Sequence, residues 1–245
     1  MRTFGLIGKD IAYSFSAKFF TAKFAASKIE AVYKNFDIPK IEDFPKVLSS
    51  NPQLQGLNVT IPYKEKIIPL LDRLDPVAKE IGAVNTIKFE KNGTLTGFNT
   101  DHYGFTRSIS SHLQPHHTHA LILGTGGASK AVAYSLRKMK LEVKFVSRNA
   151  SEDTLTYHSL TPGHLKQYTV IINCTPLGTS PNIELYPPIP VEYLSSAHLI
   201  FDLIYNPEIT HLMKLGIQKN ASVVNGLHML EFQAEKSWEI WNTTG

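Results

Sequence analysis

Residues 120–131 read ALILGTGGASKA, and the rest of the chain is best interpreted from this stretch. An apolar run leads into closely spaced glycines, and an alanine-rich stretch follows at once. This order of strand, glycines and helix is typical of a dinucleotide-binding turn, because glycines let the backbone approach a pyrophosphate at the helix N-terminus. Ser129 stands where a third glycine is usual. The residues predicted to bind the dinucleotide are Gly124, Gly126, Gly127 and Ala128. A purely structural turn is the alternative.

The next apolar run, residues 142–147, predicts which dinucleotide is bound. It ends about 23 residues after Gly124, where enzymes that use NAD carry an acidic residue for the ribose 2′-hydroxyl. This chain has Ser147, Arg148 and Asn149 instead. A guanidinium can donate two hydrogen bonds to a 2′-phosphate, which a carboxylate would repel. The loop therefore favours NADP, the alternative being a surface arginine in a connecting loop.

Towards the C-terminus, further apolar runs predict a parallel sheet. Near-continuous apolar runs are typical of parallel strands that are covered on both faces. These apolar runs, the two runs at residues 120–123 and 142–147, and a helix over 102–113 together predict a Rossmann-type dinucleotide-binding domain over residues 103–227. The further predicted strands are residues 169–174, 198–204 and 222–226. Residues 228–241 have apolar side chains at helical spacing, and we expect this C-terminal helix to return to the first domain.

Towards the N-terminus, strand-like and helix-like stretches alternate, which is typical of a mostly parallel α/β sheet. Asn92-Gly93 between two β-rich runs adds an antiparallel hairpin at the sheet edge. The sequence thus predicts an α/β substrate domain over residues 1–102, with 228–245 packed back on it. Its predicted strands are 3–8, 31–38, 56–61, 84–90 and 94–99, and its helices are 16–28 and 41–50.

Polar side chains stand at or near the ends of these predicted strands, where open α/β sheets bind their ligands. Ser14 and Ser16 lie at a helix entry, where hydroxyls and free backbone N–H groups can hold a carboxylate; plain helix capping is the alternative. The other members are Asn58, Thr60, Lys64, Asn85, Thr86, Asn99, Thr100 and Asp101. Singly, each asparagine has the alternative of a turn residue and Lys64 that of a solvated side chain. Together they suit a polyhydroxylated acid.

Composition excludes several classes of function. The chain has 245 residues and a net charge of +4, and its 25 Lys and Arg form no long run, which disfavours nucleic-acid binding. No apolar window is long enough for a membrane span, and the N-terminus lacks a secretory signal. One cysteine, Cys174, allows no internal disulfide, so we expect a cytoplasmic protein. Residues 115–119, PHHTH, lack acidic or cysteine partners, which predicts a solvated connection rather than a metal site.

Motifs along essentially the whole chain resemble those of the shikimate dehydrogenase family. YSFS resembles the serine pair of that family, and NVTIPYK, GAVNT and GFNTD resemble its substrate and catalytic segments. GTGGASKA resembles its nucleotide loop, SRN its phosphate clamp, and NCTPLGT the loop beside the nicotinamide ribose. DLIYNP and GLHMLEFQA are similar to later segments that contact substrate and nicotinamide. The departures are Ala17 and Phe19-Phe20 after the serines, and a clamp that keeps only its arginine.

The resemblance implies NADPH-dependent, reversible reduction of 3-dehydroshikimate to shikimate in aromatic amino-acid biosynthesis. It implies Lys64 and Asp101 as the acid–base pair, and a monomer or a homodimer. The implied substrate residues are Ser14, Ser16, Thr60, Asn85, Tyr205 and Gln233, with Asn58 in support. The implied cofactor residues are Gly124, Gly126, Gly127, Ala128, Ser147, Arg148, Asn149, Thr175, Gly226 and Met229. The alternatives are a quinate/shikimate dehydrogenase that uses NAD, and a nucleotide-sensing relative without turnover.

Overall fold

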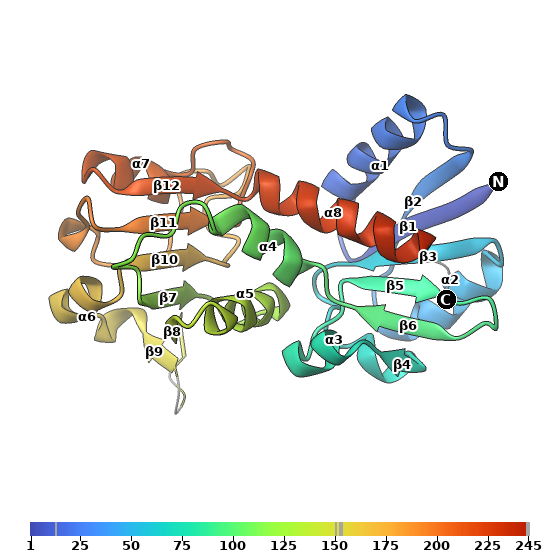
Figure 1. The fold of residues 1–245 in the computed structure, drawn as a ribbon, viewed down its shortest axis with the longest axis horizontal. Helices are drawn as coiled ribbons and strands as arrows, with labels where there is room; N and C mark the ends of the chain where they lie inside the picture. Colours follow the sequence, from blue (N-terminus) through green and yellow to red (C-terminus); the bar gives the residue numbers. More distant parts are fainter. Residues whose placement is uncertain (13, 150, 152–153, 244–245) are drawn as a thin grey trace. The chain divides into compact units, whose positions relative to one another are not determined.

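The chain divides into two compact units in the computed structural model, which describes residues 1–12, 14–149, 151 and 154–243 (Figure 1). Unit 1 comprises Met1–Tyr103 and Leu230–Gly245, and unit 2 comprises Gly104–Met229. The units are described separately below.

Unit 1 is built on a mixed sheet with the strand order β2-β1-β3-β5-β6-β4. Its strands are β1 (Arg2–Gly8), β2 (Ala31–Asp37), β3 (Leu54–Val59), β4 (Arg73–Leu74), β5 (Thr86–Phe89) and β6 (Leu95–Phe98). The pairings of β1 with β2, β1 with β3 and β4 with β6 are parallel, whereas β5 is antiparallel to β3 and β6. The mostly parallel sheet and the β5–β6 hairpin are confirmed. The two-residue strand β4, which was not predicted, lies outside the hairpin.

The helices of unit 1 differ from the prediction in two places. They are α1 (Phe15–Ala26), the 3-10 turn η1 (Ile41–Asp43), α2 (Phe44–Ser50), the 3-10 turn η2 (Ile68–Leu70) and α3 (Pro76–Ile81). The helix predicted around 41–50 is present but divided: a 3-10 turn comes first, and the α-helix begins at Phe44, with Pro45 in its first turn, where proline is tolerated. Helix α3 was missed, although Asp75 caps its N-terminus and Gly82 ends it in the left-handed region.

Unit 2 contains a parallel sheet with the strand order β12-β11-β10-β7-β8-β9, as far as the described residues go (Figure 1). Its strands are β7 (His119–Leu123), β8 (Glu142–Ser147), β9 (Thr154–Thr156), β10 (Val170–Asn173), β11 (Leu199–Asp202) and β12 (Ser222–Asn225). Counted along the chain within this unit, the order is that of the doubly wound dinucleotide-binding fold. The predicted Rossmann-type sheet is therefore confirmed.

Helices cover both faces of the unit 2 sheet. Its helices are α4 (Asp101–Ile109, shared with unit 1), α5 (Gly127–Lys138), the 3-10 turns η3 (Tyr157–Ser159) and η4 (Val191–Tyr193), α6 (Pro162–Gln167) and α7 (His211–Gln218). Ile122 packs in one apolar cluster with Leu136 of α5, and its neighbour Leu121 packs in another with Leu165 of α6 and Leu212 of α7. Successive strand residues thus face opposite layers, which explains the near-continuous apolar runs.

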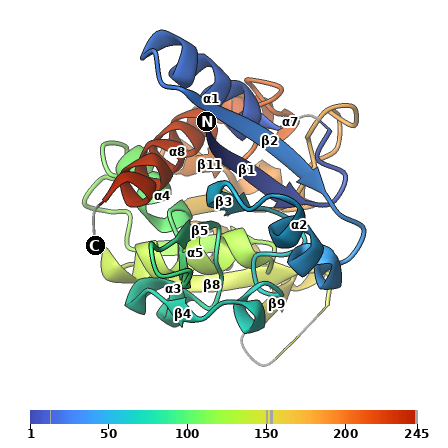
Figure 2. The ribbon, with the colours of Figure 1, turned by 90° about the vertical axis from the view of Figure 1, so that its right-hand side faces the viewer.

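Helix α8 (Leu227–Asn242) contributes its residues from Leu230 onward to unit 1. Trp241 donates a hydrogen bond from Nε1 to the carbonyl oxygen of Ile87, 3.0 Å away. Its indole stacks on Phe4, and both side chains pack in an apolar cluster with Phe20 of α1. Figure 2 faces unit 1 and shows α1 beside the edge strand β2 near the top. Helices α1 and α8 therefore share one cluster.

The histidine-rich connection is mostly exposed, as predicted, with His117 as the exception. His117 is only 8% exposed; its Nδ1 accepts a hydrogen bond from the backbone N–H of Gln114, and its Nε2 lies 3.2 Å from the carbonyl oxygen of Ala197. Burial lowers the pKa of His117, which favours the neutral ring that acceptance at Nδ1 requires. Within the described residues, no three or more His, Cys, Asp or Glu side chains gather as a metal site would require. No described helix is long and apolar enough to cross a membrane.

Candidate functional site

Lys64 and Asp101 form a short, mostly buried ion pair in unit 1. Lys64 Nζ lies 2.6 Å from Asp101 Oδ2, and the two side chains are 14% and 7% exposed. Lys64 follows β3, and its carbonyl oxygen accepts a hydrogen bond from the N–H of Val84. Asp101 is the first residue of α4, where the helix dipole stabilises a carboxylate. Burial lowers the pKa of the neighbouring His102, whereas the charge of Asp101 raises it.

Asn85 holds the second carboxylate oxygen of Asp101. The backbone N–H of Thr100 donates to Asn85 Oδ1 over 2.6 Å, and this contact fixes which way the amide points. Asn85 Nδ2 therefore faces the carboxylate and donates to Asp101 Oδ1 over 2.8 Å. Each oxygen of Asp101 thus has its own donor, which a buried charge requires. The family resemblance implies a contact between Asn85 and substrate. This contact stays a prediction, because the buried amide already forms hydrogen bonds within the protein.

Gln233 of α8 reaches the same group of side chains. Its Oε1 lies 3.3 Å from Asn85 Nδ2 and 3.4 Å from Thr100 Oγ1, and its Nε2 donates to the carbonyl oxygen of Leu230. Residues separated by 148 positions in the sequence are therefore neighbours. Lys64, Asp101, Asn85 and Gln233 form one polar cluster within unit 1.

Asn58 lies beneath this cluster and acts as a structural support. Its Oδ1 accepts from the Tyr33 hydroxyl over 2.8 Å, and its Nδ2 lies 3.2 Å from Thr86 Oγ1 and 3.0 Å from Ser237 Oγ. Thr60 comes after the end of β3, because β3 ends at Val59, two residues before the end of the predicted strand at residue 61. Its backbone pairs with Ile7 and Tyr63, so Thr60 belongs to the turn that leads to Lys64.

Ser237 and Tyr33 belong to the network around the site but were missed in the sequence. Ser237 Oγ lies within 3.2 Å of Asn58 Nδ2, Thr86 Oγ1 and Thr100 Oγ1. Its spacing of four residues from Gln233 on α8, which puts both on one helix face, was the available signal. Tyr33 had no such signal, since its contact partner depends on strand pairing.

The hydroxyls of Ser14 and Ser16 are both engaged within the protein. Ser14 Oγ caps α1 by accepting from the N–H of Ala17, and it donates to Asn35 Oδ1 over 3.1 Å. Ser16 is buried, and its hydroxyl lowers the pKa of Tyr33 against the effect of burial. The capping alternative is therefore realised at Ser14. A role for either serine in binding a carboxylate stays a prediction.

In unit 2, the N-terminus of α5 is open to an anion. Gly126 is its N-cap and makes no side-chain capping bond, no acidic residue stands in the first turn, and a Cβ at Gly126 would meet no atom within 4 Å. Gly127 and Ala128 are the first residues of the helix. Ser129 is fully buried and donates to the carbonyl oxygen of Gly126, so the missing third glycine is accommodated. The first N–H groups of α5 are suited to a pyrophosphate.

Gly124 and Thr175 lie side by side where the strand order of the unit 2 sheet reverses, between β7 and β10. Gly124 has a φ of 104°, and a Cβ there would lie 3.2 Å from Thr175 Cγ2. Thr175 donates from its N–H and hydroxyl to Asn173 Oδ1, and Asn173 Nδ2 donates to the buried carboxylate of Asp202. Burial raises the pKa of Asp202 by more than the hydrogen bonds to its carboxylate lower it. Open α/β sheets bind ligands at this reversal.

The Ser147–Asn149 loop adjoins the glycine turn. Gly124 donates to the carbonyl oxygen of Val146, the residue before Ser147, over 2.8 Å. Ser147 Oγ accepts from the N–H of Asn149, which folds the loop tightly. Arg148 is exposed. Burial raises the pKa of the nearby Tyr157, and the positive charge of Arg148 lowers it.

Three residues from the predicted sites lie elsewhere in unit 2. Gly226 packs so closely on the carbonyl oxygen of Leu203 that a Cβ would strike it, which requires glycine on packing grounds alone. Met229 is buried in the core with Phe105. Tyr205 is 39% exposed and belongs to unit 2, whereas the other implied substrate residues belong to unit 1.

Known proteins resemble this chain over nearly its whole length. The family model described as "Shikimate dehydrogenase substrate binding domain" matches residues 6–87. A protein of Clostridium botulinum strain Hall named "Shikimate dehydrogenase (NADP(+))" is 35% identical, over 100% of this chain and 98% of the relative. A shikimate dehydrogenase structure from Aquifex aeolicus is 35% identical with a TM-score of 0.86, over 99% of this chain and 92% of that one.

A shikimate 5-dehydrogenase structure from Thermus thermophilus, in complex with NADP(H) and shikimate, is 29% identical. Its TM-score is 0.87, over 99% of this chain and 94% of that one. The likeness therefore covers both units rather than the first alone. On the identity to the Clostridium relative and its coverage, this chain belongs to the shikimate dehydrogenase family.

Proposed function

We propose that this chain catalyses the reversible reduction of 3-dehydroshikimate to shikimate with NADPH, a step of aromatic amino-acid biosynthesis. The observation that carries the proposal is the Lys64–Asp101 pair at 2.6 Å, held in a buried polar cluster. A relative that is 35% identical is named for this activity and for NADP(+). The proposed substrate and cofactor domains are units 1 and 2, respectively.

The proposed chemistry assigns the proton to the Lys64–Asp101 pair. When bound, NADPH supplies the hydride. The carbonyl oxygen that becomes a hydroxyl then needs a proton from a group within hydrogen-bond reach. An ammonium has three N–H donors, of which Asp101 takes one, so Lys64 can donate to a substrate oxygen while its charge stays paired. Asn85 keeps Asp101 in place during the transfer.

For the cofactor, we propose that the first N–H groups of α5 hold the pyrophosphate and Arg148 the 2′-phosphate. The absence of a side-chain cap at Gly126 supports the first assignment. The nearness of the Ser147–Asn149 loop to Gly124 supports the second. Beyond these ligands, we propose a cytoplasmic monomer or homodimer without a nucleic-acid partner, in keeping with the scattered basic residues and the small net charge.

The proposed function is tested by following NADPH oxidation by absorbance with purified protein and 3-dehydroshikimate. We expect turnover with NADPH, much less with NADH, and reversal when shikimate and NADP are supplied. Quinate serves as the comparison substrate. No oxidation above background by protein that is folded by circular dichroism would overturn the proposal, and better turnover of quinate with NAD would replace it with the first alternative.

We expect replacement of both Ser14 and Ser16 with alanine to raise the KM for shikimate about tenfold or more. Both hydroxyls can turn from Asn35 and Tyr33 towards a carboxylate, and each hydrogen bond to a charged group contributes about 1.5 kcal/mol or more. The KM for NADP should not change. Steady-state kinetics with each substrate varied in turn gives both values.

Ser27→Ala is the matched control, since Ser27 is exposed at the other end of α1. The double variant should also unfold at a lower temperature, because a lost serine cap costs about 1 kcal/mol. An earlier melting transition with an unaltered KM for shikimate would show that the two serines serve α1 and not the substrate.

A further inference from the structure

A continuous chain of hydrogen bonds joins Tyr33 of β2 to the Lys64–Asp101 pair within unit 1. We call it the Tyr33–Asp101 network. Its members are Tyr33, Asn58, Thr86, Ser237, Thr100, Asn85 and Asp101.

Ser237 stands at the junction of this network. Its side chain is 0% exposed, and its hydroxyl donates to the carbonyl oxygen of Gln233 one turn earlier on α8, over 2.9 Å. Asn58 Nδ2 donates to the Ser237 hydroxyl over 3.0 Å. The Thr86 and Thr100 hydroxyls lie 2.8 and 3.2 Å from it, and in each of these two contacts either oxygen can be the donor. Ser237 thus ties α8 to β3 and β5.

From Ser237 the network leads to Asp101 in two steps. Thr100 Oγ1 lies 3.2 Å from Ser237 Oγ and 3.0 Å from Asn85 Nδ2. The same Thr100 fixes the Asn85 amide through its backbone N–H, and Asn85 then donates to Asp101. A shift of Thr100 would therefore be transmitted to the carboxylate.

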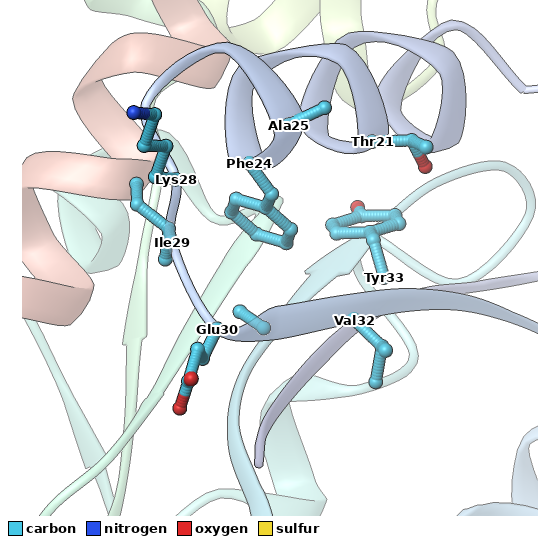
Figure 3. A pocket seen from close by; sticks show the side chains of 9 residues that line it. Thr21, Phe24, Ala25, Lys28, Ile29, Glu30, Val32 and Tyr33 are labelled. Carbon is cyan, nitrogen blue, oxygen red and sulfur yellow. The ribbon is translucent and has the colours of Figure 1, made fainter.

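In the other direction, the network leads to Tyr33. The Tyr33 hydroxyl donates to Asn58 Oδ1 over 2.8 Å. The Tyr33 ring stacks on Phe20 and forms part of the wall of a surface hollow of about 550 Å³, together with Phe24 and Val32 (Figure 3). Burial keeps the pKa of Tyr33 well above its usual value, so the phenol remains a donor. Its oxygen can be removed while the ring stays packed.

We propose that Ser237 is a positioning residue for the reaction, which holds Asp101 through Thr100 and Asn85 and is coupled to Tyr33 through Asn58. The proposal rests on the proposed function. Helix stability alone does not account for this serine, because alanine is the better helix former and a buried hydroxyl stabilises only when it is hydrogen-bonded. Its contacts instead serve the polar cluster around Asp101.

The test is Ser237→Ala, with kcat and both KM values measured beside the melting temperature. We expect kcat to fall about five- to tenfold, the effect of one lost orienting hydrogen bond, with an unchanged KM for NADP. Asn58 Nδ2 keeps its contacts with Thr86 and the carbonyl oxygen of Asn85, so the protein should fold. Ser237→Cys, which is nearly isosteric and a weak donor and acceptor, should recover part of kcat.

Ser108→Ala is the matched control. Ser108 is also a buried helical serine, but its hydroxyl has no hydrogen-bond partner among the described residues, so kcat should stay at the wild-type value. Wild-type kcat and pH profile in Ser237→Ala, with only a lower melting temperature, would overturn the proposal. An inactive wild-type enzyme would instead overturn the proposed function, which keeps the two failures distinct.

Tyr33→Phe tests the coupling between Tyr33 and Ser237 and does not depend on the folding of Ser237→Ala. We expect kcat/KM for shikimate to fall about fivefold from the loss of the hydrogen bond to Asn58. The double variant Tyr33→Phe/Ser237→Ala should lose less kcat/KM than the product of the two single losses, because both changes break one network. Where the alanine variant does not fold, Tyr33→Phe/Ser237→Cys replaces it in this comparison. Losses that multiply independently would overturn the coupling.

Discussion

Lys64→Ala is expected to lower kcat about 100-fold or more, the usual range for the loss of a group that carries a proton in the transition state. Lys64 Nζ lies 2.6 Å from Asp101, and no other lysine or arginine pairs with that carboxylate in the described structure. An alanine cannot donate to the substrate oxygen, and apart from Asp101 the other residues of the cluster, Asn85 and Gln233, are amides, which are much weaker acids. Steady-state rates of NADPH oxidation with saturating 3-dehydroshikimate measure the effect.

Lys66→Ala is the control for this variant, since Lys66 lies two residues away and is exposed. It should keep the wild-type kcat. Removing Lys64 also leaves Asp101 a buried carboxylate without its cation, so the melting temperature should fall, and rates should be measured well below it. The KM for NADPH should barely change in folded protein. A Lys64→Ala enzyme with near-normal kcat would remove Lys64 from the mechanism.

Arg148→Ala is expected to lower kcat/KM for NADPH about 10- to 100-fold, which corresponds to about 1.5–3 kcal/mol for hydrogen bonds to a charged group. Ser147 and Asn149 add no charge, and the Ser147 hydroxyl is engaged with the Asn149 backbone, so the preference for NADP should depend mainly on this guanidinium. Activity with NADH should hardly change, because NADH has no 2′-phosphate. Higher salt should weaken the binding of NADPH more than the binding of NADH, since Arg148 is exposed.

Arg137→Ala is the matched control, because Arg137 is an exposed arginine at the far end of α5, away from the glycine turn. It should leave both cofactors unaffected. If Arg148→Ala reduces kcat/KM equally for NADPH and NADH, Arg148 supports the loop and does not recognise the phosphate. The measurement is therefore the ratio of the two cofactors in each protein, at low and at moderate salt.

Five strands of unit 2 were predictable because their signals are local, whereas the three-residue strand β9 was missed. Strands β7, β10 and β11 are apolar runs that are almost fully buried, and the glycine turn at Gly124 marks the first of them. The order of the strands follows from right-handed crossovers, which leave few alternatives. Short elements were missed for the converse reason. The two-residue strand β4 and the six-residue helix α3 are too short to show a hydrophobic period, although the caps of α3 at Asp75 and Gly82 are readable.

Residue types at strand ends were enough to predict Lys64, Asn85 and Asp101 as site candidates, and family resemblance added Gln233. Their arrangement was not predictable, because it depends on contacts between distant segments. Gln233 lies beside Asn85 only because α8 packs on the unit 1 sheet, where Trp241 bonds to Ile87. The direction of the Asn85 amide is set by the backbone N–H of Thr100, which no sequence pattern reports.

The amino-acid sequence thus determined which elements form and which residue types stand at their ends, because hydrophobic periods, glycines and caps act over a few neighbouring residues. Only the tertiary structure decided which donor meets which acceptor. Asn85 turned out to be a partner of Asp101, and Ser237 a junction between three elements. A hydrogen bond requires its atoms to lie within about 3 Å, and that accuracy arises only when whole helices and strands are packed together.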